Sequence, residues 1–406
     1  MRARADDAAG GNPMDNDLLE TTLAALYEEP AQSVKDREEN SFDRLAGRFS
    51  GTLVLFGAGE LGKLTARCLR EVGNPAQYFA DNNPSLWGAT VEGLRVLPTL
   101  EAVQKYKSSA CFVVTLYNGR TVRAQLKQLE CRCVLHFAPL FWKYSKIFIP
   151  ASCLGLPSVI FHHADAIRSA FSVLADDPSR KLFCEQLTWR VLLNSEAMLP
   201  HSDASDIYFQ PDLITPSAHE TLVDCGAFDG DTIRSFLTLN QNRFERIYAL
   251  EPDPINRKAL DTYRHTLSDG IASRIEIFPY AVGNTRTRVL FSAGNAVASR
   301  IVSAGDSGET ECLPLDEAME GRFPTFIKMD IEGAEPEAIQ GARRILNESQ
   351  PVLAACVYHR SEHLWEIPSL IRSISPRHKI FLRRYAEDCW ELVCYALPEH
   401  RVARPN

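Results

Sequence analysis

Long apolar segments are absent from this sequence, and so are the usual marks of secretion. No run of about eighteen apolar residues, the length that a membrane-spanning helix needs, occurs anywhere in the chain. The first residues, MRARADDAAGGNPMDND, contain no apolar segment of the kind that a signal peptide carries. The eleven cysteines include no CxxC pair, and several lie within apolar runs, which is typical of buried free thiols. These absences predict a cytoplasmic protein with no membrane span.

The sequence also has no excess of positive charge. The 406 residues carry a net charge of -8, and the isoelectric point is near 5.8. A broad phosphate-binding surface needs the opposite sign, so we expect no nucleic acid partner, although a local basic patch stays compatible with these totals. With 45% hydrophobic and 24% charged residues the composition is that of a globular protein, and the length favours two domains.

The most informative stretch is VDCGAFDGDT, residues 223–232. The apolar run at its start predicts a short buried strand, and Gly226 and Gly230 permit a tight turn with close approach of the backbone to a ligand. A helix should follow, with Asp231 or Thr232 as its N-cap. Backbone N–H groups and the positive end of the helix dipole then face one crevice.

A second predicted strand, residues 246–250, ends at Glu251, about twenty residues after the turn. A carboxylate there can accept hydrogen bonds from ribose hydroxyls. The two glycines have the spacing GxxxG, and the third, helix-packing glycine of a dinucleotide site is missing. The pattern therefore indicates a nucleoside site that does not bind a dinucleotide.

Four motifs in the right order resemble those of the FkbM-family S-adenosylmethionine-dependent methyltransferases. They are VDCGAFDGDT, the acid in YALEPDP, FIKMDIEGAE (326–335) and VYHRSEHLWEIP (357–368), and the similarity runs from about residue 189 to 397. The resemblance implies the seven-stranded α/β sheet of a class I methyltransferase. It also implies S-adenosyl-L-methionine as cofactor, S-adenosyl-L-homocysteine as product, and a small hydroxyl-bearing acceptor.

The resemblance assigns the cofactor contacts as well. Five residues of the turn should surround the methionine part and the ribose: Asp224, Gly226, Ala227, Phe228 and Gly230. Glu251 should hold the ribose hydroxyls. Ala281 and Val282, at the end of the third strand, should form the wall for adenine.

Charged residues interrupt the apolar segment FIKMDIEGAE. Lys328, Asp330 and Glu332 alternate along a predicted strand, and such groups are costly to bury unless they are paired or used. Asp330 could orient the ammonium group of the donor or the hydroxyl of the acceptor, with Lys328 as the ion-pair partner of Asp330 or Glu332. Glu335 suits the first turn of the next helix, where it complements the dipole, or it belongs to the site.

His359 is the candidate general base, because it follows a buried strand and its ordinary pKa suits proton removal near neutral pH. A structural histidine is the alternative. HRSEH also matches the inverted zinc-protease pattern, but that pattern needs both histidines on one helix, so we expect no metal. Many relatives carry an acid in place of His363, which leaves its role open. Tyr208 and Phe209 either line a substrate mouth or pack in the core.

Residues 51–140 have the pattern of a second, small Rossmann-like domain. LVLF is followed by GAGELG, with Gly57, Gly59 and Gly62, then by a helical run and a strand that ends at Asp81. The segment resembles the nucleotide-sugar-binding domains of some sugar-modifying enzymes and, more loosely, NAD-binding domains. A nucleotide or NAD site and an empty scaffold are both compatible with it. No tyrosine begins a YxxxK pair, so the acid/base arrangement of short-chain dehydrogenases is missing.

We expect five parts along the chain: a disordered tail and short helices (1–50), the small Rossmann-like domain (51–140), a helical connector (141–220), the methyltransferase domain (221–398) and a tail (399–406). The predicted strands of the methyltransferase domain are TLVDC, RIYALE, IEIFPYAV, FIKMDI, VLAACVY, KIFLRR and WELVCYAL, the last two antiparallel.

The sequence thus predicts an O-methyltransferase that acts on a sugar, a glycan precursor or a secondary metabolite. A first alternative is an NAD-dependent nucleotide-sugar oxidoreductase that uses Gly57 to Asp81. A second is a non-catalytic sensor or scaffold that binds the methyl donor. The acceptor, the metal requirement and the oligomeric state, including a homo-oligomer, are left open.

Overall fold

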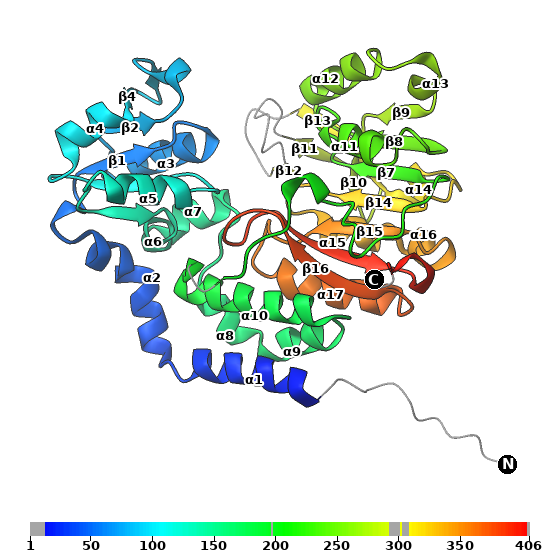
Figure 1. Ribbon diagram of the computed structural model, residues 1–406, viewed down its shortest axis with the longest axis horizontal. Helices are drawn as coiled ribbons and strands as arrows, with labels where there is room; N and C mark the ends of the chain where they lie inside the picture. The colour runs from blue at the N-terminus through cyan, green and yellow to red at the C-terminus, as the bar shows by residue number, and fades with distance from the viewer. Residues whose placement is uncertain (1–12, 196–197, 292–300, 303–307, 404–406) are drawn as a thin grey trace.

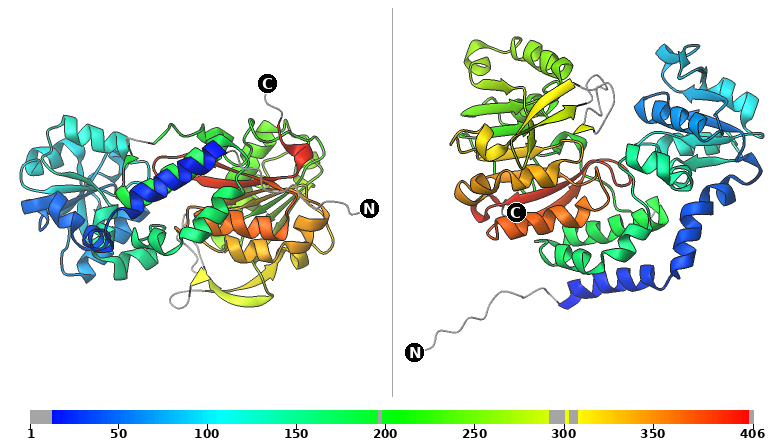
Figure 2. Two further views of the ribbon diagram at one scale, coloured as in Figure 1. Left: turned by 90° about the horizontal axis from the view of Figure 1, so that it is seen from below. Right: turned by 180° about the vertical axis from the view of Figure 1, so that it is seen from behind.

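The computed structural model describes residues 13–195, 198–291, 301–302 and 308–403. Three β-sheets of six, four and seven strands organise these residues. Figures 1 and 2 show the first sheet with its helices on one side of the molecule and the other two sheets on the opposite side. The α/β fold class predicted from the sequence is confirmed. Residues 1–12 of the expected N-terminal tail and residues 404–406 of the C-terminal tail lie outside the described residues.

Two helices, α1 (Pro13–Tyr27) and α2 (Ala31–Ala46), precede the six-stranded sheet. The elements of this sheet and its helices are β1 (Leu53–Phe56), α3 (Glu60–Glu71), β2 (Tyr78–Asp81), β3 (Thr90–Val91), β4 (Leu94–Pro98), α4 (Thr99–Tyr106), β5 (Cys111–Val114), α5 (Arg120–Gln128) and β6 (Val134–His136). The strand order is β3-β4-β2-β1-β5-β6, and only β3 and β4 pair antiparallel. β1 and β5 are wholly buried and apolar, as expected for strands covered on both faces.

Five helices connect this sheet to the last one: α6 (Ala138–Lys143), α7 (Ser145–Phe148), α8 (Ser158–His162), α9 (Ala164–Ser172) and α10 (Asp177–Leu192). Phe141 stacks on Phe148 with ring centroids 4.2 Å apart, which fixes α6 against α7. α10 packs on α1 and on a strand of the seven-stranded sheet, β16 (Lys379–Arg384). In Figure 1, α1, α8, α9 and α10 accordingly lie beneath the large sheets.

The seven-stranded sheet has the order β16-β17-β15-β14-β7-β8-β9. Its elements, besides β16, are β7 (Thr221–Cys225), α11 (Asp231–Leu239), β8 (Arg246–Leu250), α12 (Pro254–Arg264), α13 (Asp269–Ala272), β9 (Ile275–Phe278), β14 (Phe326–Met329), α15 (Glu335–Gln340), α16 (Arg343–Glu348), β15 (Val352–Cys356), α17 (His363–Ile374) and β17 (Leu392–Leu397). β17 pairs antiparallel with both neighbours, and the other pairs are parallel. A ligand of such a sheet sits beyond the carboxyl ends of the parallel strands, where the strand order reverses at β7 and β14.

The third predicted strand, IEIFPYAV, is wrong as a single element. β9 ends at Phe278, and the chain re-enters a different sheet at β10 (Ala281–Gly283). Pro279 lies between them and has no N–H to donate to a ladder, which explains the break. The new sheet has the order β10-β13-β11-β12 and was not predicted; its other elements are β11 (Thr287–Phe291), β12 (Ile301–Val302), β13 (Gly308–Pro314) and the following α14 (Leu315–Ala318).

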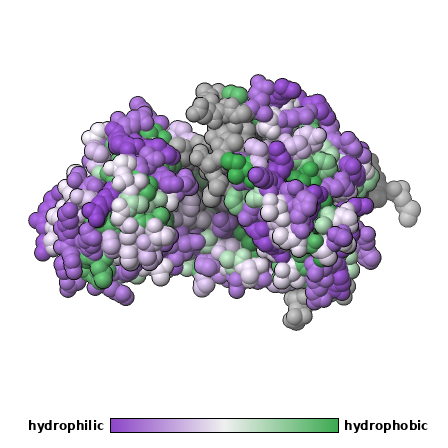
Figure 3. Space-filling model, turned by 90° about the horizontal axis from the view of Figure 1, so that it is seen from above, coloured by the Kyte–Doolittle hydropathy of each residue, from purple (hydrophilic) through white to green (hydrophobic). Residues whose placement is uncertain are grey.

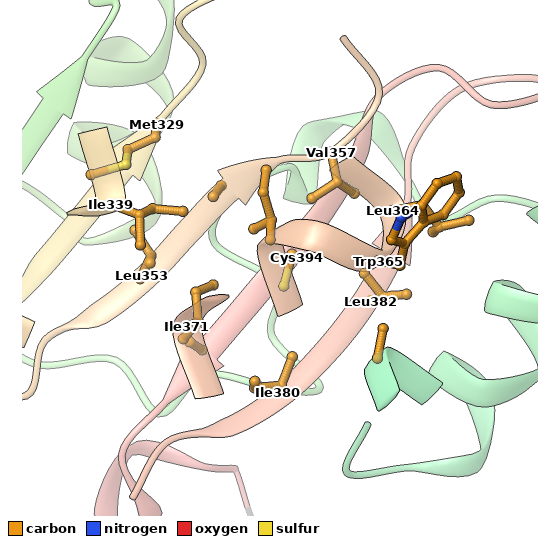
Figure 4. Close-up of a cluster of buried hydrophobic side chains, with 14 of the residues drawn as sticks. Met329, Ile339, Leu353, Val357, Leu364, Trp365, Ile371, Ile380, Leu382 and Cys394 are labelled. Carbon is orange, nitrogen blue, oxygen red and sulfur yellow. The ribbon is translucent and has the colours of Figure 1, made fainter. Parts of the chain in front are cut away.

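The largest core cluster lies between the seven-stranded sheet and the helices on one of its faces. Figure 4 shows Met329 and Leu353 of the sheet beside Ile339 of α15, and Ile380 of the sheet beside Ile371 of α17. All five side chains are at most 1% exposed. On the outside, polar residues cover most of the face seen in Figure 3, with hydrophobic residues scattered among them. The site therefore rests on a rigid, apolar sheet.

Candidate active site

The site is built around the turn between β7 and α11. Gly226 follows the end of β7 with a φ of 78°, a left-handed conformation that favours glycine. A Cβ at this position would lie 2.0 Å from the backbone oxygen of Asp330, so only glycine fits. The N-cap of α11 is Gly230, with a φ of 89°, and not Asp231 or Thr232 as predicted.

Glu251 lies directly after β8 and binds backbone N–H groups of the turn and of the following segment. Its carboxylate accepts a hydrogen bond from the Phe228 N–H at 2.8 Å and another from the Asp253 N–H at 2.8 Å. Burial raises the pKa of Glu251 to about 7, although these two hydrogen bonds oppose the rise. A carboxylate offers about four lone-pair positions, so this one can still accept hydrogen bonds from a ligand.

A cavity of about 430 Å³ opens beside the turn. Several residues that the sequence predicted for the cofactor site line it: Gly226, Phe228, Glu251, Ala281, Val282 and Asp330. Asp224, Ala227, Gly230 and His359 are not among its lining residues. Asp224 and Ala227 are fully buried behind the turn. Gly230 abuts Leu260 and Tyr263 of α12, so it serves the packing of the turn.

Lys328 and Asp224 form a buried ion pair beneath the turn, with Lys328 Nζ 3.1 Å from Asp224 Oδ1. The lysine also donates a hydrogen bond to the Gly226 carbonyl at 2.7 Å. Burial alone would lower the pKa of Lys328, but the carboxylates of Asp224 and Asp330 raise it above its ordinary value. Lys328 therefore stays charged, pairs with Asp224 and holds the turn through the Gly226 carbonyl, rather than pairing with Asp330 or Glu332 as predicted.

Asp330 lies just past the end of β14, at the edge of the cavity. Tyr208 Oη donates a hydrogen bond to its Oδ2 at 2.8 Å, and His359 Nε2 lies 3.3 Å from its Oδ1. Burial alone would raise the pKa of Asp330, but His359, Lys328 and Tyr208 hold it well below its ordinary value. Asp330 is therefore an ionised, fixed acceptor.

His359 lies between carboxylates on both sides of its ring. Its Nδ1 is 2.9 Å from Glu335 Oε1, and its Nε2 faces Asp330 and, at 3.8 Å, Glu332 Oε2. Burial alone would lower the pKa of His359, but Glu335 and Asp330 raise it well above its ordinary value. An imidazolium has no free lone pair, so this geometry argues against the predicted role of general base.

Glu335 connects both histidines of the HRSEH segment. It opens α15, is fully buried, and accepts a hydrogen bond from the Ile331 N–H at 2.9 Å. His363 Nδ1 lies 3.5 Å from its second oxygen, and burial lowers the pKa of His363 to about 4. Glu335 thus has two roles. It complements the helix dipole at the start of α15, and its negative charge pairs with His359.

The family comparison shows what this domain is similar to. Residues 224–380 match the family model described as the methyltransferase FkbM domain. We call the C-terminal domain that contains these residues the FkbM domain, after the model that it matches.

One solved structure shares the fold over most of the chain. The crystal structure of a methyltransferase FkbM from Methylobacillus flagellatus is similar with a TM-score of 0.71 and 24% identity, over 94% of this chain and all of that one. A precorrin-6y C5,15-methyltransferase from Geobacter metallireducens is similar with a TM-score of 0.29 and 13% identity, over 48% of this chain and 86% of the other. None of the curated proteins matches the chain. Among the described helices, none has both the length and the apolar character to cross a membrane.

The FkbM domain also contains site residues that the sequence did not reveal. Glu391 and Tyr385, in the hairpin between β16 and β17, line the cavity together with Tyr358. Burial, with Asp330 as the next contribution, raises the pKa of Glu391 to about 7. The only signal in the sequence was an acid directly before the apolar run LVCYAL, which is too common to predict a role.

The two aromatic residues before the FkbM domain have different roles. Tyr208 lines the cavity and has a φ of 67°. Phe209 packs on Phe236 and Phe326, with ring centroids 5.5 Å and 5.2 Å away. Tyr208 thus lines a cavity, as one alternative predicted, and Phe209 packs in the core, as the other predicted.

The first glycine turn, in the six-stranded sheet, resembles the turn at Gly226 in its construction. Asp81 accepts hydrogen bonds from the Ala58 N–H at 2.9 Å and the Asn83 N–H at 2.8 Å. Gly57 has a φ of 104°, and a Cβ at Gly62 would lie 1.9 Å from the Gly57 oxygen, so both are needed for packing. Gly59 has nothing within 4 Å of an added Cβ. The nucleotide or NAD site at these residues stays a prediction.

One group near the cavity has the spacing of metal ligands. Asp330, Glu335 and His359 each offer one ligand atom, and these atoms lie within 4.8 Å of one another. His359 as a cation already lies between the two carboxylates and offsets one of their two negative charges. The expectation that the site needs no metal stays a prediction.

Proposed function

We propose that the FkbM domain is an S-adenosylmethionine-dependent O-methyltransferase. The observation that carries the proposal is Glu251, which lies in the cavity beside the Gly226 turn with lone pairs left for ribose hydroxyls. Ala281 and Val282 supply an apolar wall for adenine, and Gly226 lets the turn pack directly against the Asp330 backbone at the edge of the cavity. Bound there, S-adenosyl-L-methionine would supply an activated methyl group and leave as S-adenosyl-L-homocysteine.

The protein itself must position the acceptor and remove its proton. Asp330 is a fixed carboxylate that accepts a hydrogen bond from the acceptor hydroxyl. Glu391 faces the same cavity, and its pKa of about 7 suits a group that takes up a proton near neutral pH. We assign the proton to Glu391, while His359 keeps Asp330 ionised and in place.

The lining also supports a polyhydroxylated acceptor, such as a sugar, a glycan precursor or a hydroxylated secondary metabolite. Asp330, Glu332 and Glu391 are acceptors for hydroxyl groups, and Tyr358 and Tyr385 offer flat faces. All eleven cysteines are free, which supports a reducing compartment such as the cytoplasm.

Titration calorimetry with the full-length protein tests the donor. We expect saturable binding of S-adenosyl-L-methionine and transfer of a radiolabelled methyl group to hydroxyl compounds. Binding of NAD without binding of S-adenosyl-L-methionine would overturn the proposal in favour of an oxidoreductase. Binding of the donor without transfer to any hydroxyl acceptor would favour the sensor.

The pH dependence of transfer tests Glu391. The residue accepts a proton only when ionised, so kcat should fall about tenfold per pH unit below its pKa. With a pKa of about 7, the fall begins near neutral pH. Glu391→Gln should lower kcat about 10²-fold to 10⁴-fold and remove this dependence, with the donor affinity unchanged. A variant that keeps the acid limb would assign the proton to another group.

A further inference from the structure

A second cavity, of about 620 Å³, lies outside the FkbM domain. Residues of α2, α5, β6 and α6 line it together with the end of α10. Its volume lies within the range of small-molecule sites, roughly 300–1,000 Å³. It shares no lining residue with the cavity beside Gly226, so a ligand here would be independent of the methyl donor.

The charges on this cavity have one sign. Its basic lining residues are Arg37, Arg44, Arg120, Arg123 and Lys127, and no aspartate or glutamate of the described residues belongs to the lining. Arg37 pairs with Glu29 and Arg44 with Asp36, outside the cavity. Lys127 is exposed on α5 and takes part in no ion pair recorded in the described structure. In a chain of net charge -8, this concentration of positive charge needs an explanation.

Three residues of the same lining carry buried hydrogen-bond donors without partners. Arg37 Nη1, Arg123 Nη1 and Ser41 Oγ are buried and have no hydrogen-bond partner, and all three residues belong to the lining. Buried donors are normally satisfied, so three in one place mark missing acceptors. An arginine offers donors only, and therefore the missing partner must bring acceptors.

His136 faces a buried acid at the inner end of the cavity. Its Nδ1 accepts a hydrogen bond from the Ala138 N–H at 3.0 Å, which leaves the proton of the neutral ring on Nε2. This Nε2 has no hydrogen bond, and Asp388 Oδ2 is 3.4 Å away at the inner end. Asp388 also lies 3.9 Å from Arg123 Nη2, so it neutralises part of the charge there. Arg120 Nη2 lies 4.0 Å from Asp388 as well, so Lys127 is the basic lining residue without an ion pair in the described part of the chain.

We propose that the cavity between α2, α5 and the end of α10 binds a phosphate-bearing small molecule. A phosphate group supplies several acceptor oxygens and negative charge, the two properties that the lining requires. The cavity exceeds what inorganic phosphate alone would fill, so an organic phosphate is the favoured form. Trp142 and Trp189 are almost fully buried in the wall and shape the apolar part.

Titration calorimetry of the full-length protein in phosphate-free buffer tests the proposal. The probes are inorganic phosphate, pyrophosphate and glucose 1-phosphate. We expect saturable binding that weakens as salt is added, and at least tenfold weaker binding in Arg123→Gln and in Lys127→Gln. Tighter binding of glucose 1-phosphate than of the inorganic anions would assign an organic phosphate. Equal binding of all three would still support the site but assign the phosphate group alone.

Arg132→Gln is the matched control, because this arginine is exposed on the same domain and does not line the cavity. It should bind every probe as the unaltered protein does. The unfolding midpoint of each variant reports its fold without use of the methyl donor, so failure of the proposed methyltransferase would leave this test intact. Should Arg123→Gln not fold, the exposed Lys127 decides. Absence of saturable binding, or equal affinity in both cavity variants, would overturn the proposal.

Discussion

The two glycine turns of this protein have nearly the same construction. Each turn follows the first strand of its sheet. In each, an acid at the end of the neighbouring strand accepts hydrogen bonds from two backbone N–H groups. For Asp81 these distances are 2.9 Å and 2.8 Å, and for Glu251 both are 2.8 Å. The acid is thus part of the turn itself in both domains. Its presence alone does not identify a ligand site.

The difference lies in the strand on the other side of each turn. β5 ends in Phe112, Val113 and Val114, and the next residue is Thr115. The Thr115 hydroxyl donates hydrogen bonds to the carbonyl oxygens of Phe56 at 2.9 Å and Gly57 at 3.0 Å. β14 instead carries Lys328, and the position that corresponds to Thr115 is Asp330. One turn is therefore closed by an uncharged side chain, whereas the other is surrounded by fixed charges.

The largest effect should come from removing the charge beneath the second turn. Lys328→Met leaves Asp224 as a buried carboxylate without a partner, which should lower the free energy of unfolding by about 3–5 kcal/mol near pH 8. The pKa of Asp224 is already raised to about 6 and would rise further, so the loss grows as the pH rises above the unfolded value of about 4. Chemical denaturation at pH 5 and pH 8 measures it.

Thr115→Val is the matched change at the first turn and should cost only about 1 kcal/mol, without dependence on pH. Lys328→Met combined with Asp224→Asn should recover part of the loss. Equal losses from Lys328→Met and Thr115→Val would show that the two turns do not differ in this way.

An intermediate effect is expected when each acid is changed to its amide. Glu251→Gln should weaken the binding of S-adenosyl-L-methionine about 10-fold to 100-fold, because it loses charge-assisted hydrogen bonds to the ribose. Asp81→Asn should leave this affinity unchanged, since its turn lies in the other domain. Titration calorimetry of both variants measures the difference. Weaker binding in both would mean that the turns act as one unit.

The smallest effect concerns the contact between the two domains. Glu387, in the β16–β17 hairpin, accepts a hydrogen bond from the Arg120 N–H at 2.7 Å, and its own N–H donates to Asn118 at 3.0 Å. Glu387→Ala should lower the free energy of unfolding by about 1 kcal/mol. It should also raise KM for the acceptor a few-fold, because the same hairpin carries Glu391.

Steady-state kinetics and chemical denaturation of Glu387→Ala test this expectation. Glu399→Ala is the control, since that exposed residue pairs with Lys379 at the far end of the hairpin. An unchanged KM in Glu387→Ala would show that the first domain does not help to position the hairpin.

Much of the fold could be predicted because local patterns specify it. The strand before Gly226 and the acid at Glu251 are visible within about thirty residues, and the seven-stranded sheet is confirmed. The four-stranded sheet escaped prediction because β10 and β12 have only three and two residues, and because β11 and β13 mix polar with apolar residues. Pro279 was the one local signal for the break after β9.

The charge states of the site could not be predicted, since they depend on groups that are distant in sequence. His359 gains its raised pKa from Glu335 and Asp330, on the two sides of its ring, and only the folded chain brings them together. Glu391 is buried beside Asp330 because β17 inserts between β15 and β16. Its sequence context resembles that of many surface turns.

The position of β17 also determines when the seven-stranded sheet can be completed during synthesis. It is synthesised after the other six strands of its sheet, yet it lies in the interior of that sheet, between β15 and β16. Until residue 397 is synthesised, β15 has an unpaired edge and Tyr385 and Glu391 have no fixed place. A nascent chain can therefore complete its first Rossmann-like unit early, but it completes the cavity beside Gly226 only after β17 has been synthesised.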